Sequence, residues 1–578
     1  MLSENTNAHY SKFFAFNQRL IEQSIGQQSG PGANRLPEIV TTLTQAYAQN
    51  PHQWAEIHAD YLRKQGQLWR GFTQVKAGEE VPAIITPAPG DRRFHDPAWR
   101  TLPFFDFLKQ SFLLAADLLN RLVDSAELAD DEKNRLAFHV QHYLDALAPS
   151  NFLATNPEAL RLAFQTDGES LRLGMENFAR DLERGRISMS DESGFAVGKN
   201  LAMTPGAVVF ENEYMQLIQY APSTKQVYQR PLLIVPPFIN KFYILDLQPE
   251  NSFVRYAVEQ GHQVFLISWR NVGPELGVAT WDDYIEHALM KAMAVIRELR
   301  GADKLNALGF CVGGTLLASV LAVQHAKKRN PVASLTLLTT MLDFSDTGRI
   351  SAYIDDDYVN NCETRHGRGE VMSGADLAHC FASLRANELI WFYVVNNYLK
   401  GQTPRAFDLL YWNADSSNLP GVLYAYYIKN MYSENNLKTA GRLTMCGVPV
   451  DLGKIAAPTF LLASREDHIV PWHSAYASTH LLSGQLEFVL AASGHIAGVI
   501  NAPSKGKRNY WTNRTLPDDP EAWLSGAQSV PGSWWAHWAA WLARHAGKKV
   551  RASTELGDAS YRPIEAAPGR YVSENSRQ

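Results

Sequence analysis

The pattern of hydrophobic and polar positions along the chain changes near residue 205. Before that point, hydrophobic residues recur every three to four positions, as at Phe105, Leu108 and Phe112, and this spacing is typical of amphipathic helices. We therefore expect residues 1–204 to form an all-helical N-terminal domain. Within it, the stretch 81–93 carries three prolines and a glycine and is expected to link a first pair of helices to the next ones.

From about residue 205, short apolar runs alternate with helical patterns. Strands that are apolar on both faces are typical of a parallel sheet covered by helices on both sides. The expected fold class for 205–578 is therefore α/β, with a mostly parallel, doubly wound sheet. The predicted strands are Leu232–Val235, Gln263–Ser268, the run beginning at Leu305, Ser334–Thr339, Thr459–Leu462 and Leu486–Leu490, and the predicted helices between them include Gln248–Glu259, Trp281–Leu299 and Leu316–Ala326.

The alternation stops after Phe344 and restarts near Ile455. The interval is rich in aromatic residues, and we expect it to form an insertion at about 345–450 that lies above the strand ends as a lid. A separate helical core that uses the aromatics for packing is the alternative. Near the end of the chain, Ser533–His545 is predicted to be a helix. The polar tail beyond Lys548 is expected to be disordered or a surface strap.

The composition indicates a globular protein of more than one domain, because 46% of the 578 residues are hydrophobic. A net charge of -5 with no long basic block disfavours nucleic acid as a partner. The N-terminus lacks the pattern of a secretory signal, and apolar stretches such as Phe112–Ala116 are too short to span a bilayer. We therefore expect a cytoplasmic protein without a transmembrane segment.

The chain contains four cysteines, and Cys311 differs from the others in its surroundings. There is no Cys-x-x-Cys pair and no histidine at metal-ligand spacing, so we expect neither a disulfide nor a metal site. Cys362, Cys380 and Cys446 are expected to be ordinary thiols. Cys311 instead lies in Gly309-Phe310-Cys311-Val312-Gly313, between an apolar strand and an apolar helix.

This Gly-x-Cys-x-Gly pattern is typical of a nucleophile elbow with cysteine in place of serine. The tight strand-to-helix turn requires small residues two positions before and after the nucleophile, where Gly309 and Gly313 stand. The helix N-terminus favours thiolate over thiol, and the Val312 amide is placed to bind an oxyanion. A buried structural cysteine beside a glycine-rich turn is the alternative at this point.

An elbow nucleophile needs an acid and a histidine, in that chain order, from loops after later strands. Asp467 follows the strand Thr459–Leu462, and His495 follows the strand Leu486–Leu490. Glu466 and His468 compete with Asp467, because adjacent side chains point apart. The second oxyanion donor is expected in the loop after the first core strand, at the amide of Ile239 or Asn240. Thiolate attack on a thioester exchanges one thioester for another at little cost in free energy, whereas attack on an amide or oxyester is uphill. An acyl-CoA donor is therefore favoured.

Together these motifs resemble the poly(3-hydroxyalkanoate) synthases, which polymerise (R)-3-hydroxyacyl-CoA into storage polyester on an α/β-hydrolase core. The resemblance covers nearly the whole chain. It rests on stretches that include 236–246, 309–314, 464–472, 493–498 and 151–157.

The resemblance implies that Cys311 carries the acyl and growing chains and that His495 activates it. Asp467 would orient His495 or help to deprotonate the incoming 3-hydroxyl. Val312 resembles the class that works as a homodimer on short acyl groups such as 3-hydroxybutyryl, although pocket size at Ala497 could broaden the range. CoA would be the leaving group, no cofactor or metal is implied, and the protein would lie at the surface of polyester granules.

Two other functions are compatible with the same residues. A thioesterase or related hydrolase would use Cys311, Asp467 and His495 with water as the acceptor and would yield free acid. A granule-coating structural protein with a vestigial elbow is the second alternative. The intact set of three residues argues against it.

Overall fold

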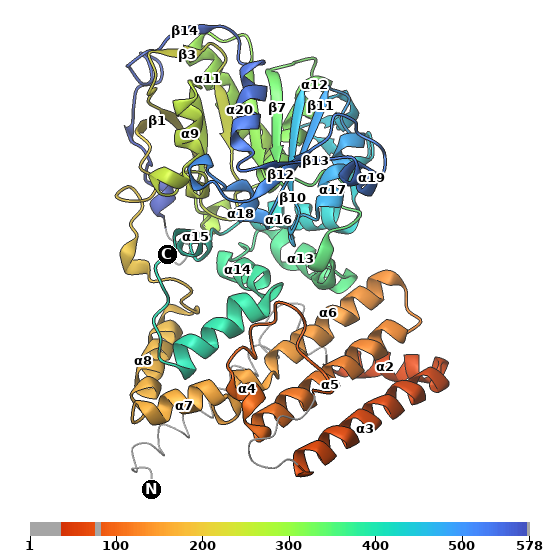
Figure 1. Ribbon diagram of the computed structural model, residues 1–578. Helices are drawn as coiled ribbons and strands as arrows, with labels where there is room; N and C mark the ends of the chain where they lie inside the picture. The colour runs from red at the N-terminus through yellow and green to blue at the C-terminus, as the bar shows by residue number, and fades with distance from the viewer. Residues whose placement is uncertain (1–35, 75–82, 575–578) are drawn as a thin grey trace. The chain divides into compact units, whose positions relative to one another are not determined.

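The computed structural model describes residues 36–74 and 83–574 (Figure 1). The chain divides into two compact units. Unit 1 holds the residues up to Asp191 together with Cys380–Arg405, and unit 2 holds Glu192–His379 together with the residues from Ala406 onward. The insertion expected at about 345–450 is therefore not a single body, because residues 380–405 are part of unit 1.

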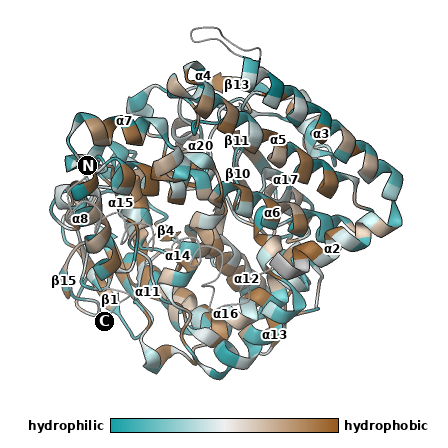
Figure 2. Ribbon diagram, turned by 90° about the horizontal axis from the view of Figure 1, so that it is seen from below, coloured by the Kyte–Doolittle hydropathy of each residue, from teal (hydrophilic) through white to brown (hydrophobic). Residues whose placement is uncertain are grey.

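Unit 1 is built from helices whose hydrophobic residues lie on one side. Figure 2 shows brown and teal residues alternating along α3 and α5, as expected for amphipathic helices. The predicted linker 81–93 lies partly outside the described residues, and its described part has no helix or strand. The elements of unit 1 are α2 (Leu36–Gln49), α3 (Pro51–Gln74), α4 (Ala98–Thr101), α5 (Pro103–Ser125), α6 (Asp130–Ala146), η1 (Pro149–Asn151), η2 (Leu153–Thr155), α7 (Pro157–Gln165), α8 (Glu169–Arg184), η10 (Asn387–Trp391) and η11 (Val394–Leu399).

The segment 380–405 is part of unit 1 because its apolar side chains are buried against the N-terminal helices. Trp391, Val394 and Leu399 are buried in one cluster with Ala146 and Ala159 of the N-terminal helices. Burial of such side chains is worth about 1.5–3 kcal/mol each. Trp391 and Tyr398 of this part of the insertion thus pack into a helical core, which was the alternative to a lid.

Unit 2 contains a mixed sheet in the order β13-β12-β11-β10-β7-β6-β4-β5-β2-β1-β15. The six strands from β11 to β5 in this order pair in parallel, as predicted, and the flanking strands pair antiparallel. The strands are β1 (Gly206–Glu211), β2 (Met215–Tyr220), β4 (Leu232–Val235), β5 (Val264–Trp269), β6 (Leu305–Phe310), β7 (Val332–Leu338), β10 (Thr459–Ser464), β11 (Leu486–Ala491), β12 (Asn509–Thr512), β13 (Gln528–Pro531) and β15 (Glu565–Ala566).

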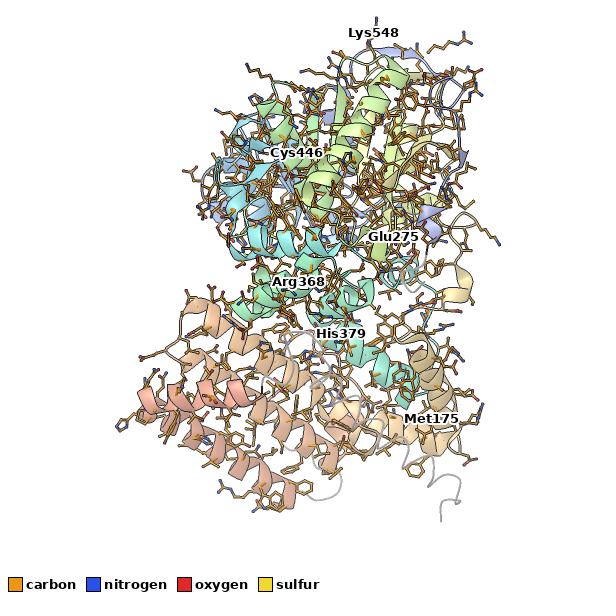
Figure 3. The ribbon with its side chains drawn as sticks, turned by 180° about the vertical axis from the view of Figure 1, so that it is seen from behind. Met175, Glu275, Arg368, His379, Cys446 and Lys548 are labelled. Atoms are coloured by element: carbon orange, nitrogen blue, oxygen red, sulfur yellow. The ribbon has the colours of Figure 1, made fainter. Side chains whose placement is uncertain are left out.

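Helices cover both faces of this sheet. On one face α9 and α20 pack together through Phe253 and Trp538, whose ring centroids are 4.7 Å apart (Figure 1). The other face, turned toward the viewer in Figure 3, carries η7, α11 and α12. The helices are α9 (Phe253–Glu259), α10 (Trp281–Asp283), η7 (Tyr284–Met290), α11 (Lys291–Arg300), α12 (Val312–Ala326), α13 (Asp356–Arg365), α14 (Gly374–Ser383, across the unit boundary), α15 (Asp408–Asn413), α16 (Gly421–Tyr427), η12 (Ile428–Ser433), α17 (Trp472–Ala477), α18 (His495–Val499), α19 (Pro520–Ser525) and α20 (Trp535–Ala543).

The tail beyond Lys548 is a strap along unit 2. Its strand β14 (Lys549–Arg551) pairs with β3 (Gln226–Tyr228), β15 extends the main sheet beside β1, and the turn η17 (Tyr571–Ser573) contacts β5. In the described part of the chain, no helix has both the length and the apolar character needed to cross a bilayer.

Candidate active site

Cys311 lies in a tight turn between β6 and α12. Its backbone has φ 54° and ψ −130°, a conformation that L-residues rarely adopt, and its N–H donates to the Leu338 carbonyl at 2.9 Å. A Cβ on Gly309 would lie 2.4 Å from the Gly314 Cα, and one on Gly313 would lie 2.5 Å from the Val235 carbonyl oxygen. Both glycines are therefore required by contact with neighbouring backbone. The Cys311 turn has the shape of a nucleophile elbow and places the thiol at the N-terminus of α12.

Asp467 and His495 form a buried pair at the ends of neighbouring strands. His495 Nδ1 lies 2.7 Å from Asp467 Oδ2, and Asp467 Oδ1 accepts hydrogen bonds from the Ile469 and Val470 amides, each at 2.9 Å. The Asp467 side chain is 0% exposed. Of the two competing neighbours, Glu466 is exposed and His468 is half-buried, so the structure places Asp467 as the partner of His495.

The charges around His495 favour its protonated form. Burial by itself would lower the pKa of His495, but the charges of Asp467 and Cys311, and hydrogen bonds to both, raise the pKa above its usual value. The imidazole also stacks on the Phe310 ring, with centroids 5.6 Å apart. Cys311, Asp467 and His495 are thus brought together, and their arrangement favours the imidazolium form of His495.

The loop after β4 presents the two amides that were expected as oxyanion donors. Asn240 forms an isolated antiparallel bridge with Ser416, and the Ser417 N–H donates to the Ile239 carbonyl at 3.1 Å. In a trans peptide the C=O and N–H point in opposite directions, so this bond turns the Asn240 N–H away from Ser417. Within the described residues, neither the Ile239 nor the Asn240 amide has a hydrogen-bond acceptor. The Val312 amide is at the first position of α12, where helices lack an internal acceptor.

Tyr427 interacts electrostatically with Cys311, a relation that sequence reasoning missed. It ends α16 in the part of the insertion that belongs to unit 2. Burial raises the pKa of Tyr427 well above its usual value, and the charges of Tyr432 and Cys311 add to this effect. Its ring stacks on Trp281 with centroids 5.5 Å apart. Its aromatic character was visible in the sequence, but no local pattern distinguished it from the tyrosines around it.

Comparison with known proteins places this chain in a family. Residues 90–257 match the model described as poly-beta-hydroxybutyrate polymerase (PhaC) N-terminus, and residues 230–502 match the alpha/beta hydrolase fold. The chain is 53% identical over 527 residues to the poly(3-hydroxyalkanoate) polymerase subunit PhaC of Cupriavidus necator, covering 90% of this chain and 88% of that protein. The chain belongs to the poly(3-hydroxyalkanoate) polymerase family.

Further polymerase subunits PhaC are similar along almost the whole chain. The Rhizobium etli protein is 42% identical over 569 residues, covering 95% of this chain and 88% of its own length. The Rhizobium meliloti protein is 39% identical over 561 residues, covering 96% and 91%. The predicted α/β-hydrolase core and the family resemblance are therefore confirmed.

The other three thiols of this polymerase family member lie in different surroundings from Cys311. Burial raises the pKa of Cys362 to about 11 and the pKa values of Cys380 and Cys446 to about 12. These thiols are therefore neutral near pH 7. Among the described residues, no group of three or more His, Cys, Asp and Glu side chains is arranged to hold a metal ion.

Proposed function

We propose that this chain is an acyltransferase that polymerises (R)-3-hydroxyacyl-CoA, chiefly short-chain units such as 3-hydroxybutyryl-CoA, into poly(3-hydroxyalkanoate) with release of CoA. Membership of the polymerase family supports the reaction class. The observation that carries the residue assignment is the buried Asp467–His495 pair beside Cys311.

In the proposed acylation step, the Cys311 thiolate attacks the carbonyl carbon of the acyl-CoA thioester. The tetrahedral oxyanion is stabilised by the Val312 amide and by the Asn240 or Ile239 amide. Collapse of this intermediate breaks the bond to the CoA sulfur, which leaves as the thiol with a proton from His495. One thioester is exchanged for another, so the step is nearly balanced in energy.

In the proposed elongation step, the 3-hydroxyl of one unit attacks the thioester carbonyl of another. His495 accepts the hydroxyl proton, an ester bond forms, and a thiol is released. The bonds of Asp467 support an orienting role, because its Oδ2 contacts His495 and its Oδ1 is occupied by two backbone amides. Removal of the hydroxyl proton with direct help from Asp467 is the alternative that the resemblance left open.

Polymerisation requires that water compete poorly with the 3-hydroxyl. The Tyr427 side chain is buried and its pKa responds to the charge of Cys311, which supports a role of α16 in excluding water. The family resemblance further implies a homodimer at the surface of polyester granules. Val312, the residue after Cys311, supports a preference for short acyl groups only through the same resemblance.

The direct test compares single cysteine variants in an assay of CoA release and polyester formation. We expect Cys311→Ala to lose turnover, whereas Cys362→Ala and Cys380→Ala keep most of it. Mass spectrometry of the wild-type protein during turnover should find the acyl group on the peptide that contains Cys311. Substantial turnover by Cys311→Ala would contradict the assignment.

A further inference from the structure

The loop that carries the Ile239 and Asn240 amides is held by a lysine that the mechanism does not use. Lys241 follows Asn240 directly and is 4% exposed. Its Nζ donates to the backbone carbonyl of Glu574, 333 positions later in the chain. Burial lowers the pKa of Lys241, while the charges of Asp415 and Glu574 act in the opposite direction. A buried ammonium persists where its partners are fixed, so this contact is a structural feature of the loop.

The backbone of Lys241 is held from a second side. The Trp412 Nε1 donates to the Lys241 carbonyl at 2.7 Å, and the neighbouring Ile239 carbonyl accepts from the Ser417 amide at 3.1 Å. The segment 412–417 therefore binds the backbone carbonyls of the loop. The C-terminal tail binds the same loop through the Lys241 side chain. The peptide between Ile239 and Asn240 is held directly at its carbonyl by Ser417, and the next residue, Lys241, is held by Trp412 and by the tail.

The tail that accepts the lysine is itself anchored near the strand ends. The Asn271 amide, after β5, donates to Glu574 Oε2 at 3.1 Å, and Tyr571 Oη donates to the Asn212 carbonyl at 2.9 Å. The Tyr571 amide donates to Gln216 Oε1 of β2 at 3.2 Å. The tail is thus fixed to the antiparallel side of the sheet before it reaches Lys241.

We infer that Lys241 is a positioning residue, whose ion-dipole contact with the C-terminal strap fixes the orientation of the loop amides that stabilise the oxyanion. The inference rests on the proposed function. An oxyanion donor contributes only when its N–H is aimed at the developing charge, and loss of one donor costs about 10²–10³ in kcat. If the loop loses its contact with the tail, its amides should stabilise the oxyanion less well. The Cys311–His495 pair should stay undisturbed.

The test measures two reactions of the same thiol. Acylation by (R)-3-hydroxybutyryl-CoA passes through an oxyanion. Its rate is measured as the release of CoA in the first turnover. Alkylation of Cys311 by iodoacetamide is a displacement at carbon that forms no oxyanion. We expect Lys241→Met to slow acylation about 10- to 100-fold while alkylation stays close to wild type, and Lys241→Arg to recover part of the loss.

The control is Lys109→Met, which removes another buried lysine. Lys109 is bonded to the Trp99 carbonyl and to Asp106 in unit 1, and its replacement should leave the ratio of the acylation rate to the alkylation rate unchanged.

Two truncations keep the inference testable if Lys241→Met does not fold. A chain ending at Val572 lacks the Glu574 carbonyl, whereas a chain ending at Asn575 retains it. We expect the ratio of acylation to alkylation to fall only in the shorter chain. Equal ratios in both truncations, or a parallel loss of acylation and alkylation in Lys241→Met, would overturn the positioning role. The ratio does not depend on polymer formation, so a wild type that yields only soluble acid would contradict the proposed function and leave this inference standing.

Discussion

At the scale of single residues, the ionisation of the site depends on Asp467. His495 is buried, and burial alone lowers the pKa of a histidine, yet the pKa of His495 is raised because the charges of Asp467 and Cys311 face it. The raised value means that the imidazole can keep the thiol proton at a pH where a free histidine would have lost it. Removal of the Asp467 charge takes away the largest of the contributions that raise the pKa of His495, while burial still lowers it.

We therefore expect Asp467→Asn to lower the pKa of His495 and to slow alkylation of Cys311 by iodoacetamide about tenfold or more near pH 6.5. The defect should shrink as the pH rises, because the thiol then ionises without help from the imidazole. The measurement is the alkylation rate between pH 6 and 10. Glu466→Gln, which changes the exposed neighbour, should follow the wild-type profile; a parallel shift in both variants would show that general surface charge is responsible.

The same pair contributes to stability with a defined sign. A histidine whose folded-state pKa is raised stabilises the fold fully below its unfolded pKa, near 6.5, and this contribution is lost as the pH rises through the folded-state value. The difference in free energy of unfolding between wild type and Asp467→Asn should therefore be larger at pH 6 than at high pH. Urea unfolding at both values measures it, and a difference that grows with pH would contradict the raised pKa.

Sequence reasoning placed the acid at Asp467, but the spacing alone could not exclude the neighbours Glu466 and His468. Glu466, Asp467 and His468 follow the same strand, and their directions depend on the backbone turn after Ser464. That turn places the Asp467 carboxylate against two backbone amides and the imidazole. Lys241 and Tyr427 were missed because their partners come from distant segments of the chain, which one sequence without an alignment does not reveal.

At the scale of elements, the elbow depends on how closely α12 approaches β4. A Cβ on Gly313 would lie 2.5 Å from the carbonyl oxygens of Val235 and Pro236. We expect Gly313→Ala to destabilise the protein by about 1–3 kcal/mol, the usual range for overpacking, and to reduce activity. The matched control is Gly66→Ala in α3, where a Cβ meets nothing within 4 Å and the helix should gain about 0.5–1 kcal/mol. Unfolding midpoints in urea compare the two, and equal midpoints would argue against the close approach.

The helix α16 offers a test of water exclusion. If the Tyr427 ring shields the acyl-enzyme, Tyr427→Ala should raise the proportion of soluble 3-hydroxybutyrate among the products, because water then reaches the thioester. Tyr427→Phe keeps the ring and should give the wild-type proportion. A rise in both variants would assign the effect to the hydroxyl group, and an unchanged proportion in Tyr427→Ala would remove α16 from this role.

The central strands were predictable and the edge strands were not. Strands β4, β6 and β7 are buried on both faces, so their continuous apolar runs are visible in the sequence. In contrast, β12 is short and mostly half-buried, β13 is short and mostly exposed, and β15 has two residues. These strands form because they pair with the existing sheet, and the local sequence pattern does not predict them.

At the scale of the whole molecule, the insertion is divided between the units according to what its apolar residues contact. Trp391 and Val394 are buried with the N-terminal helices, whereas Tyr427 is buried near Cys311. The sequence shows one aromatic-rich interval and contains no signal for where it divides. The strap formed by the tail likewise depends on β1, β3 and the loop at Lys241, all of which precede it by hundreds of residues.

The measurement that tests the central claim most directly is incubation of the purified protein with (R)-3-hydroxybutyryl-CoA, with CoA release and the acyl product followed together. The account predicts stoichiometric CoA release with formation of insoluble polyester, and neither product from Cys311→Ala. CoA release with soluble 3-hydroxybutyrate as the sole acyl product would make the protein a thioesterase and would contradict the account.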